Sequence, residues 1–263
     1  MVAPAGTWSA TGSSDAPGPN SVAASADIVA VADAGGVTRL PVLRSQAPLV
    51  LRRTPDAVYL VGGAAGPIGG DSLELRIDVR AGTALRVRTA AAAVALPGPD
   101  GRESVLTVTA TVGPGGRLEY LPEPVVVCAG ARHATIIRVT LAAGASLLLR
   151  DELILGRHGE PGGASRTSLV ADYAGRPLLR QTLEVSGADP VSLGPAILAG
   201  HRAIGTLLYV DPARTASPAG DAEVAIMPLA GPGILVTALA HDAVTLRQRL
   251  TRAQSTGTSP RRN

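Results

Sequence analysis

The most regular feature of the chain is a hydrophobic pattern that occurs three times, in which an apolar residue is followed by Gly three positions later and Leu six positions later. The copies are Val79-Gly82-Leu85, Val112-Gly115-Leu118 and Leu141-Gly144-Leu147, spaced 33 and then 29 residues apart. Apolar residues alternate with others on both sides of each Gly, which is the period of a strand with one buried face. Because Gly allows a positive φ at a turn, each copy predicts two strands joined by a turn. The repetition predicts that similar strand pairs are stacked one after another.

Shorter stretches outside the repeats show the same alternation. It begins near Asp27, returns at 42–52 and 58–61, and predicts two further strands over 166–185 around a turn at 174–177. Residues 196–203 fit a short helix before a strand at 206–210. The best helix is 243–252, where Asp242 can cap the first turn and Leu246 and Leu250 share one face. The predicted fold class is therefore all-β, with stacked, β-helix-like sheets and one or two short helices.

The composition predicts one β domain with irregular ends. Residues 1–25 and 254–263 are rich in Gly, Pro, Ser and Thr, so we expect a disordered leader and a disordered tail around a scaffold domain at 26–253. The apolar share is 46%, but it comes from Ala, Val and Leu, because the chain has no Phe and one Trp. The core is therefore expected to be aliphatic.

The charge pattern argues against nucleic acid as a partner. All 24 basic residues are Arg, yet they are scattered and the formal net charge is only +3. Aromatic residues for base stacking are nearly absent. No apolar run approaches the roughly 18 residues that a membrane-spanning helix needs, so no membrane contact is expected. The single cysteine, Cys128, excludes an intramolecular disulfide and favours a reducing, cytoplasmic location.

Motifs for common catalytic chemistry are missing from the sequence. The Gly-rich run at 62–71 has neither the Lys of a Walker loop nor the spacing of a dinucleotide fingerprint, so it predicts a tight structural loop. His158-Gly159-Glu160 resembles the start of a zinc deaminase signature, but no Pro-Cys-x-x-Cys follows. No Gly-x-Ser-x-Gly elbow occurs. We therefore predict no catalytic residues and no tightly bound cofactor.

Five carboxylates are the remaining candidates for chemistry. They lie next to the predicted strand ends and turns: Asp71, Glu119, Asp151, Glu152 and Glu160. They fit solvated strand ends, and they also fit an acidic path or interface. Two alternatives stay open at this point. One is a hydrolase with Asp151 and Glu160 as an acid pair, and the other is a β-solenoid binding module for carbohydrate, against which the shortage of aromatic platforms argues.

Four motifs in order resemble one known family. Arg44-Ser45-Gln46-Ala47-Pro48-Leu49, Gly69-Gly70-Asp71, Leu118-Glu119-Tyr120-Leu121-Pro122 and Leu155-Gly156-Arg157-His158-Gly159-Glu160 look like those of the urease accessory protein UreD, also called UreH. The resemblance covers residues 38–186 well and the rest loosely. It marks Gly69, Gly70, Tyr120, Pro122, Gly156 and Arg157 as motif residues.

The resemblance implies a β-rich, non-catalytic scaffold that acts in urease maturation as a nickel metallochaperone subunit. Such a protein bridges apo-urease to the UreF-type and UreG-type accessory proteins while nickel is in transit. A transit protein should bind its ion weakly, so the five carboxylates above are candidates for a nickel path without a fixed metal site. Arg157 is expected to pair with one of them and hold two strands together. One departure is Ala90–Ala95, where the family commonly has a charged and aromatic segment, so the contacts of that segment are in question.

Overall fold

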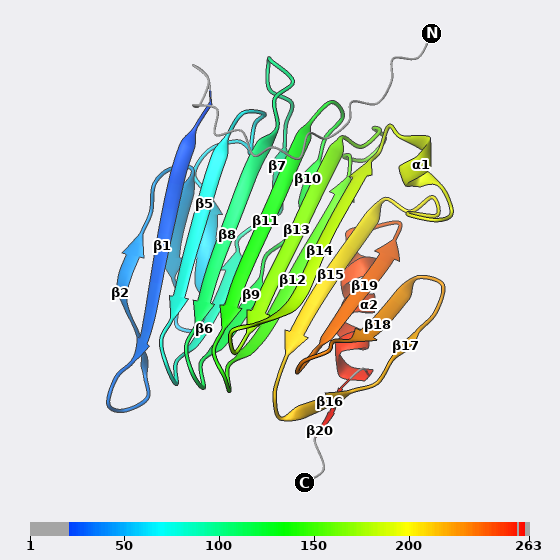
Figure 1. The fold of residues 1–263 in the computed structure, drawn as a ribbon. Helices are drawn as coiled ribbons and strands as arrows, with labels where there is room; N and C mark the ends of the chain where they lie inside the picture. Colours follow the sequence, from blue (N-terminus) through cyan, green and yellow to red (C-terminus); the bar gives the residue numbers. More distant parts are fainter. Residues whose placement is uncertain (1–20, 257, 261–263) are drawn as a thin grey trace.

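Two large β-sheets lie face to face in the computed structural model, which describes residues 21–256 and 258–260, without the side chains of 215, 216 and 256–260 (Figure 1). In spatial order, the first sheet contains β14 (Arg176–Ser186), β13 (Ala164–Tyr173), β11 (Arg132–Leu141), β8 (Ser104–Val112), β5 (Ser72–Val79), β1 (Ala23–Ala32) and β2 (Thr38–Arg44). The second contains β17 (Ala219–Gly220), β18 (Val224–Pro228), β19 (Ile234–Ala240), β15 (Ala203–Val210), β12 (Ser146–Leu155), β9 (Arg117–Leu121), β6 (Ala84–Thr89), β4 (Val58–Gly62) and β3 (Leu49–Arg53), with β10 (Val125–Val127) beside β12 and β7 (Ala93–Ala95) beside β10. A small third sheet pairs β16 (Arg214–Ala216) with β20 (Thr258–Pro260).

The three sequence repeats are the frame of both sheets. Each repeat places its first strand in the first sheet and its second strand in the second sheet, and equivalent strands are parallel neighbours. The repeat positions pair directly: Val79 with Val112, Val112 with Leu141, Leu85 with Leu118, and Leu118 with Leu147. Gly82, Gly115 and Gly144 take φ values of +64°, +63° and +77° at the turns. The prediction of an all-β, β-helix-like stack is confirmed.

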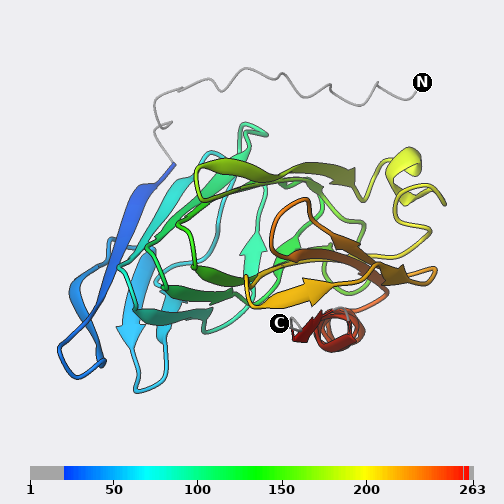
Figure 2. The same ribbon diagram turned by 60° about the horizontal axis from the view of Figure 1, so that its bottom comes forward.

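An aliphatic core fills the space between the sheets. Ile28, Leu75, Leu118 and Leu147 are among its fully buried side chains, and Tyr120 is its buried aromatic residue. A second core forms on the outer face of the second sheet, which α2 (Ala243–Thr256) covers (Figure 2). The protein therefore has one interior between its two large sheets, and α2 lies on the outer face of the second sheet.

The C-terminal helix agrees with its prediction. Asp242 caps it by accepting a hydrogen bond from the backbone N–H of Thr245, 2.8 Å away. Leu246 and Leu250 are fully buried, and Gly205 on β15 leaves room for them, because a Cβ there would lie 2.7 Å from Leu250 Cδ1. Packing of this face holds the helix on the sheet.

The other helix differs from its prediction. Residues 196–203 do not form one; α1 instead spans Pro190–Leu193, and β15 begins at Ala203. Asp189 caps α1 through the N–H groups of Val191 and Ser192, with Pro190 in the first turn. The cap and the proline start this helix earlier than the apolar pattern suggested.

The chain ends also differ in extent from the predicted leader and tail. Strand β1 starts at Ala23, inside the expected leader at 1–25, whose residues 1–20 lie outside the described part. The expected tail at 254–263 overlaps the end of α2 and all of β20, while residues 257 and 261–263 lie outside the described part. Neither helix of the described chain is long and apolar enough to cross a membrane.

Candidate functional site

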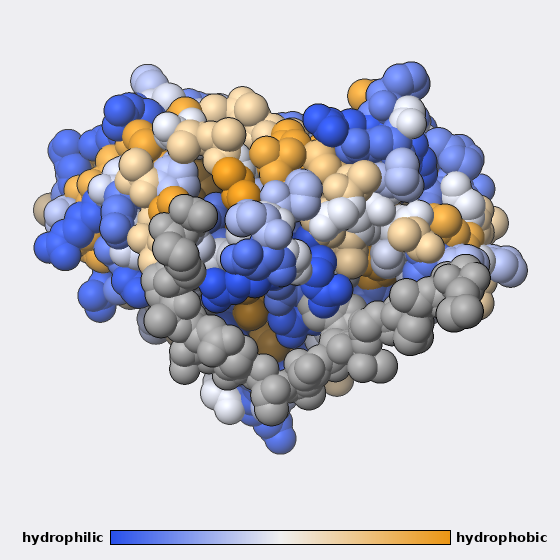
Figure 3. All heavy atoms as spheres, turned by 90° about the horizontal axis from the view of Figure 1, so that it is seen from above, coloured by the Kyte–Doolittle hydropathy of each residue, from blue (hydrophilic) through white to orange (hydrophobic). Residues whose placement is uncertain are grey.

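A cavity of about 480 Å³ lies between the two sheets. Its mouth is formed by residues 62–67 of the Gly-rich loop (62–71) and by residues 90–94. Ala64, Ala65, Ala91 and Ala92 are exposed at this mouth. The Gly-rich loop joins β4 to β5 at the upper end of the sheets in Figure 1, and the view onto that end in Figure 3 shows a recess with apolar side chains in its depth between hydrophilic residues. The Ala-rich departure from the family pattern therefore lies at the entrance of the cavity.

Asp71 fixes the shape of the Gly-rich loop. Its Oδ2 accepts a hydrogen bond from the N–H of Ile68 and its Oδ1 accepts one from the N–H of Val22, both at 2.9 Å. Gly69 passes so close to the neighbouring loop that a Cβ would lie 2.5 Å from the backbone nitrogen of Gly98. Gly70 has a φ of +98°, which favours glycine. Asp71 is buried and does not line the cavity, so its role in the structure is to hold this loop.

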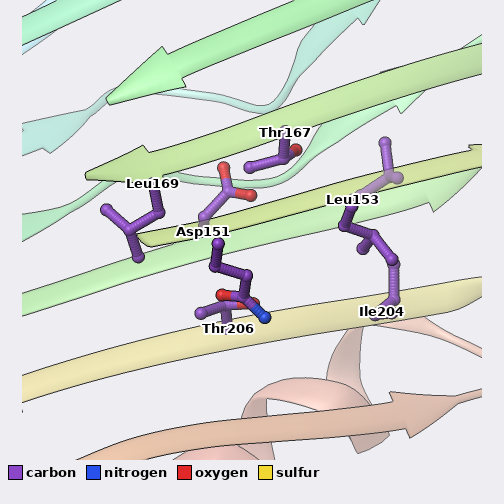
Figure 4. Close-up of a pocket in the computed structure, with 8 residues that line it drawn as sticks. Asp151, Leu153, Thr167, Leu169, Ile204 and Thr206 are labelled. Carbon is purple, nitrogen blue, oxygen red and sulfur yellow. The ribbon is translucent and has the colours of Figure 1, made fainter. Parts of the chain in front are cut away.

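Asp151 is the acidic residue in the depth of the cavity. It lies on β12 and points across the gap toward Thr167 on β13, as Figure 4 shows. Burial raises the pKa of its carboxyl to about 6, although the hydrogen bond from Thr167 favours the ionised form. The side chain also lines a smaller space of about 10 Å³ together with Thr167, Gln181 and Thr206, which is about the size of one water molecule.

Other polar groups line the cavity together with Asp151, from both sheets. Tyr120 is buried there, and burial together with the nearby Asp151 charge raises the pKa of its hydroxyl. His133 is also buried; its Nδ1 lies 2.9 Å from Ser104 Oγ and its Nε2 lies 3.3 Å from Thr135 Oγ1. Burial lowers the pKa of His133 to about 4, so the imidazole is neutral at pH 7. A hard carboxylate, hydroxyls and a neutral imidazole thus share one space, and all are groups that can contact a divalent ion.

Two of the predicted path residues lie on the outer face of the second sheet instead. Glu119 forms ion pairs with Arg86 at 3.0 Å, Arg117 at 2.9 Å and Arg88 at 3.6 Å, and its side chain is 9% exposed. Glu152 is wholly buried beneath α2, where Arg150 and Arg247 pair with it. Because side chains alternate along a strand, Tyr120 and Asp151 face the cavity while their neighbours Glu119 and Glu152 face away from it.

The fifth candidate, Glu160, closes a surface turn after β12. It accepts hydrogen bonds from the backbone N–H of Arg157 at 2.8 Å and from its guanidinium at 2.9 and 3.0 Å. These bonds lower the pKa of Glu160 to about 2. Arg157 therefore pairs with an acid, as expected, but inside one turn rather than between two strands. The link to a second strand comes from Arg202, just before β15, whose guanidinium donates to the carbonyl oxygens of Leu155, Arg157 and Glu160.

Glu123 is a cavity residue that the sequence interpretation missed. It follows the motif residue Pro122, which also lines the cavity, and its backbone N–H donates to Thr89 Oγ1 at 2.7 Å. Its carboxylate is bound by Arg247 on α2, 124 residues later in the chain. Only the Glu-Pro dipeptide after the recognised motif marked this position in the sequence. Within residues 21–256 and 258–260, no group of three or more His, Cys, Asp or Glu side chains is placed to hold a metal ion.

Comparison with known proteins gives a consistent result. Residues 23–261 match the profile of the family described as "UreD urease accessory protein". The chain is 46% identical over 264 residues to "Urease accessory protein UreD" of Parafrankia sp. (strain EAN1pec), with 89% of each chain covered. It is 47% identical over 250 residues to "Urease accessory protein UreD 3" of Streptomyces griseus subsp. griseus, covering 89% of this chain and 96% of the relative. The match spans nearly the whole described scaffold at high identity, and the chain belongs to the UreD family of urease accessory proteins.

Proposed function

We propose that this protein is a non-catalytic, cytoplasmic subunit of the urease maturation machinery that lets nickel pass through the cavity between its sheets. In this proposal it bridges apo-urease and a complex of UreF-type and UreG-type accessory proteins. GTP hydrolysis belongs to a partner, since this sequence carries no Walker loop. The contribution of the chain is to position the partners and to offer the ion a polar route.

The observation that carries the proposal is the placement of Asp151. A single carboxylate stands in the depth of the cavity, with Tyr120 on the same sheet and His133 on the facing sheet. Its raised pKa, about 6, means that a proton and a divalent cation compete for it near neutral pH. One carboxylate with neutral oxygen and imidazole neighbours binds nickel weakly enough for the ion to leave again.

The acid-pair hydrolase fits the geometry less well. Asp151 faces the interior from the middle of β12, whereas Glu160 lies in the turn beyond the end of that strand. Leu155, where β12 ends, is four positions after Asp151, so the strand places the two about 13 Å apart at the usual rise. Glu160 comes after that end, and this distance already exceeds the spacing of paired glycosidase carboxylates. With its pKa near 2, Glu160 is ionised at neutral pH and has no proton to give as a general acid.

The test is reconstitution of urease with nickel, apo-urease and the accessory proteins, comparing the native chain with Asp151→Asn. We expect the variant to assemble with its partners, because Asp151 is interior, but to deliver urease with a much lower nickel content by elemental analysis. Glu160→Gln, on the surface turn, is the matched carboxylate control and should deliver nickel normally. Full nickel loading of urease in cells that lack this protein would refute the proposal.

A further inference from the structure

The rim of the cavity mouth is also the end of a groove on the outside of the molecule. This groove, about 800 Å³, runs between α2 and the outer face of the second sheet, with Val126 and Ile154 on one side and Val244 and Arg247 on the other. Ala92 and Glu123 line both the groove and the cavity. Glu123 therefore stands where the outer groove meets the interior space.

At this junction Arg247 binds Glu123 through one of its three guanidinium nitrogens. Nη1 donates to both carboxylate oxygens of Glu123, each at 2.9 Å, while Nε and Nη2 donate to Glu152. The two carboxylates differ in burial, since the side chain of Glu152 is 0% exposed and that of Glu123 is 36% exposed. Arg247 is thus anchored on Glu152, and Glu123 is the partner that can be released.

The release of Glu123 requires little rearrangement. Its backbone stays fixed by the hydrogen bond to Thr89, so only the side chain has to turn. Exposed ion pairs are weak and exchange readily. After release, Arg247 still neutralises Glu152 and no charge is left buried alone.

We propose that Glu123 is the entry carboxylate for a divalent cation at the cavity mouth, and that Arg247 controls it by competing with the cation for its oxygens. The inference rests on the proposed function, because it concerns how an ion reaches the cavity. Glu123 and Asp151 are the two acids that line the cavity within the described residues. They mark the mouth and the depth of one route.

The experiment uses the full chain with ¹³C-labelled alanine methyl groups and Mn²⁺ as a paramagnetic probe. Methyl signals of Ala92, Ala64 and Ala65 report Mn²⁺ binding at the mouth through line broadening. Ni²⁺ should reduce this broadening by competition, because it relaxes nearby nuclei far less than Mn²⁺ does. Glu123→Gln should abolish the broadening at these methyls. Arg247→Gln should raise the apparent affinity of the mouth for Mn²⁺ about fivefold, because the exposed ion pair between Arg247 and Glu123 no longer competes with the cation.

Two further variants keep the test decisive. Arg247→Lys retains a charge for buried Glu152, and it should also strengthen Mn²⁺ binding if Arg247→Gln does not fold. Glu223→Gln is the matched control, since Glu223 is likewise 36% exposed and pairs with an α2 arginine, Arg249, but lines neither space. Unchanged broadening in Glu123→Gln would overturn the inference. If Glu123→Gln left the broadening unchanged while Asp151→Asn still lowered the nickel content of urease, the inference about the mouth would fail and the proposed function would stand. If instead Glu123→Gln abolished the broadening but Asp151→Asn delivered nickel normally, the result would count against the proposed function.

Discussion

The guanidinium of Arg202 lies where the side chain of residue 156 would begin. A Cβ on Gly156 would be 2.7 Å from Arg202 Nη2 and 2.8 Å from the carbonyl oxygens of Glu160 and Pro161. Gly156 also has a φ of +77°. The motif glycine thus leaves room for an arginine that joins the turn after β12 to the start of β15.

Gly156→Ala is therefore expected to destabilise the protein by about 2–4 kcal/mol. This cost combines the strain of a left-handed alanine with the loss of charged hydrogen bonds from Arg202 to the carbonyl groups of the turn. Urea unfolding of both proteins measures the difference. Gly82→Ala is the control, because Gly82 has a similar φ of +64° but a Cβ there would meet no atom within 4 Å. It should cost about 1 kcal/mol, and equal losses in the two variants would contradict the role given to Arg202.

Asp151 makes the stability of the protein depend on pH in a defined direction. Its pKa rises from 3.8 to about 6 on folding, so the native state binds the proton more tightly than the unfolded state does. The resulting stabilisation is complete below pH 3.8, is lost progressively up to about pH 6, and is absent above it. The full difference is at most about 3 kcal/mol.

Asp151→Asn removes this dependence, because an amide keeps the shape of the neutral carboxyl. Relative to the native protein, the variant should be more stable at pH 7 and no more stable near pH 4. Urea midpoints measured between pH 4 and pH 8 test this expectation. A constant difference across that range would mean that Asp151 titrates normally and that the cavity does not desolvate it.

The three repeats could be predicted from the sequence because the first and last positions of each repeat face the same core. Val79 and Leu85 are buried from opposite sheets, and a period of two with a Gly turn is enough to predict that. The inner and outer faces of β12 were not readable. Asp151 faces the cavity and Glu152 faces α2, yet both faces of β12 carry buried or partly buried leucines, Leu149 on the inner face and Leu148 on the outer face that α2 covers. When both faces are apolar, alternation no longer indicates which acid is interior.

The ion pair between Glu123 and Arg247 could not be predicted from the sequence for a different reason. The two residues are 124 positions apart, and their contact depends on where α2 docks on the second sheet. The sequence predicted this helix, its cap and its buried face, but amphipathic period alone does not specify the sheet strands that receive it. Tertiary docking, rather than any local motif, placed this pair at the cavity mouth.

Helix α2 is held by two leucines, which gives a direct test of that docking. Leu250→Ala should cost about 2–5 kcal/mol, because Leu250 is fully buried against Gly205 and a cavity would remain. Val244→Ala lies on the same helix but the side chain is 68% exposed, so it should change stability by no more than about 0.5 kcal/mol. Denaturant unfolding followed by circular dichroism compares them, and similar effects would show that α2 is not anchored through its leucine face.

The turn at Glu160 provides a prediction that depends on charge rather than packing. Hydrogen bonds from the side chain and backbone of Arg157 lower the pKa of Glu160 from 4.5 to about 2. Stability from this pair is therefore present above pH 4.5 and is lost as the pH falls toward 2. In Arg157→Ala the pKa of Glu160 should rise toward 4.5 but stay below it, since the backbone N–H of residue 157 still donates. Carboxyl ¹³C NMR titration measures the midpoint, with Arg138→Ala as a control at an exposed arginine of β11. A Glu160 midpoint near 4.5 in the native protein would show that the turn does not hold its carboxylate.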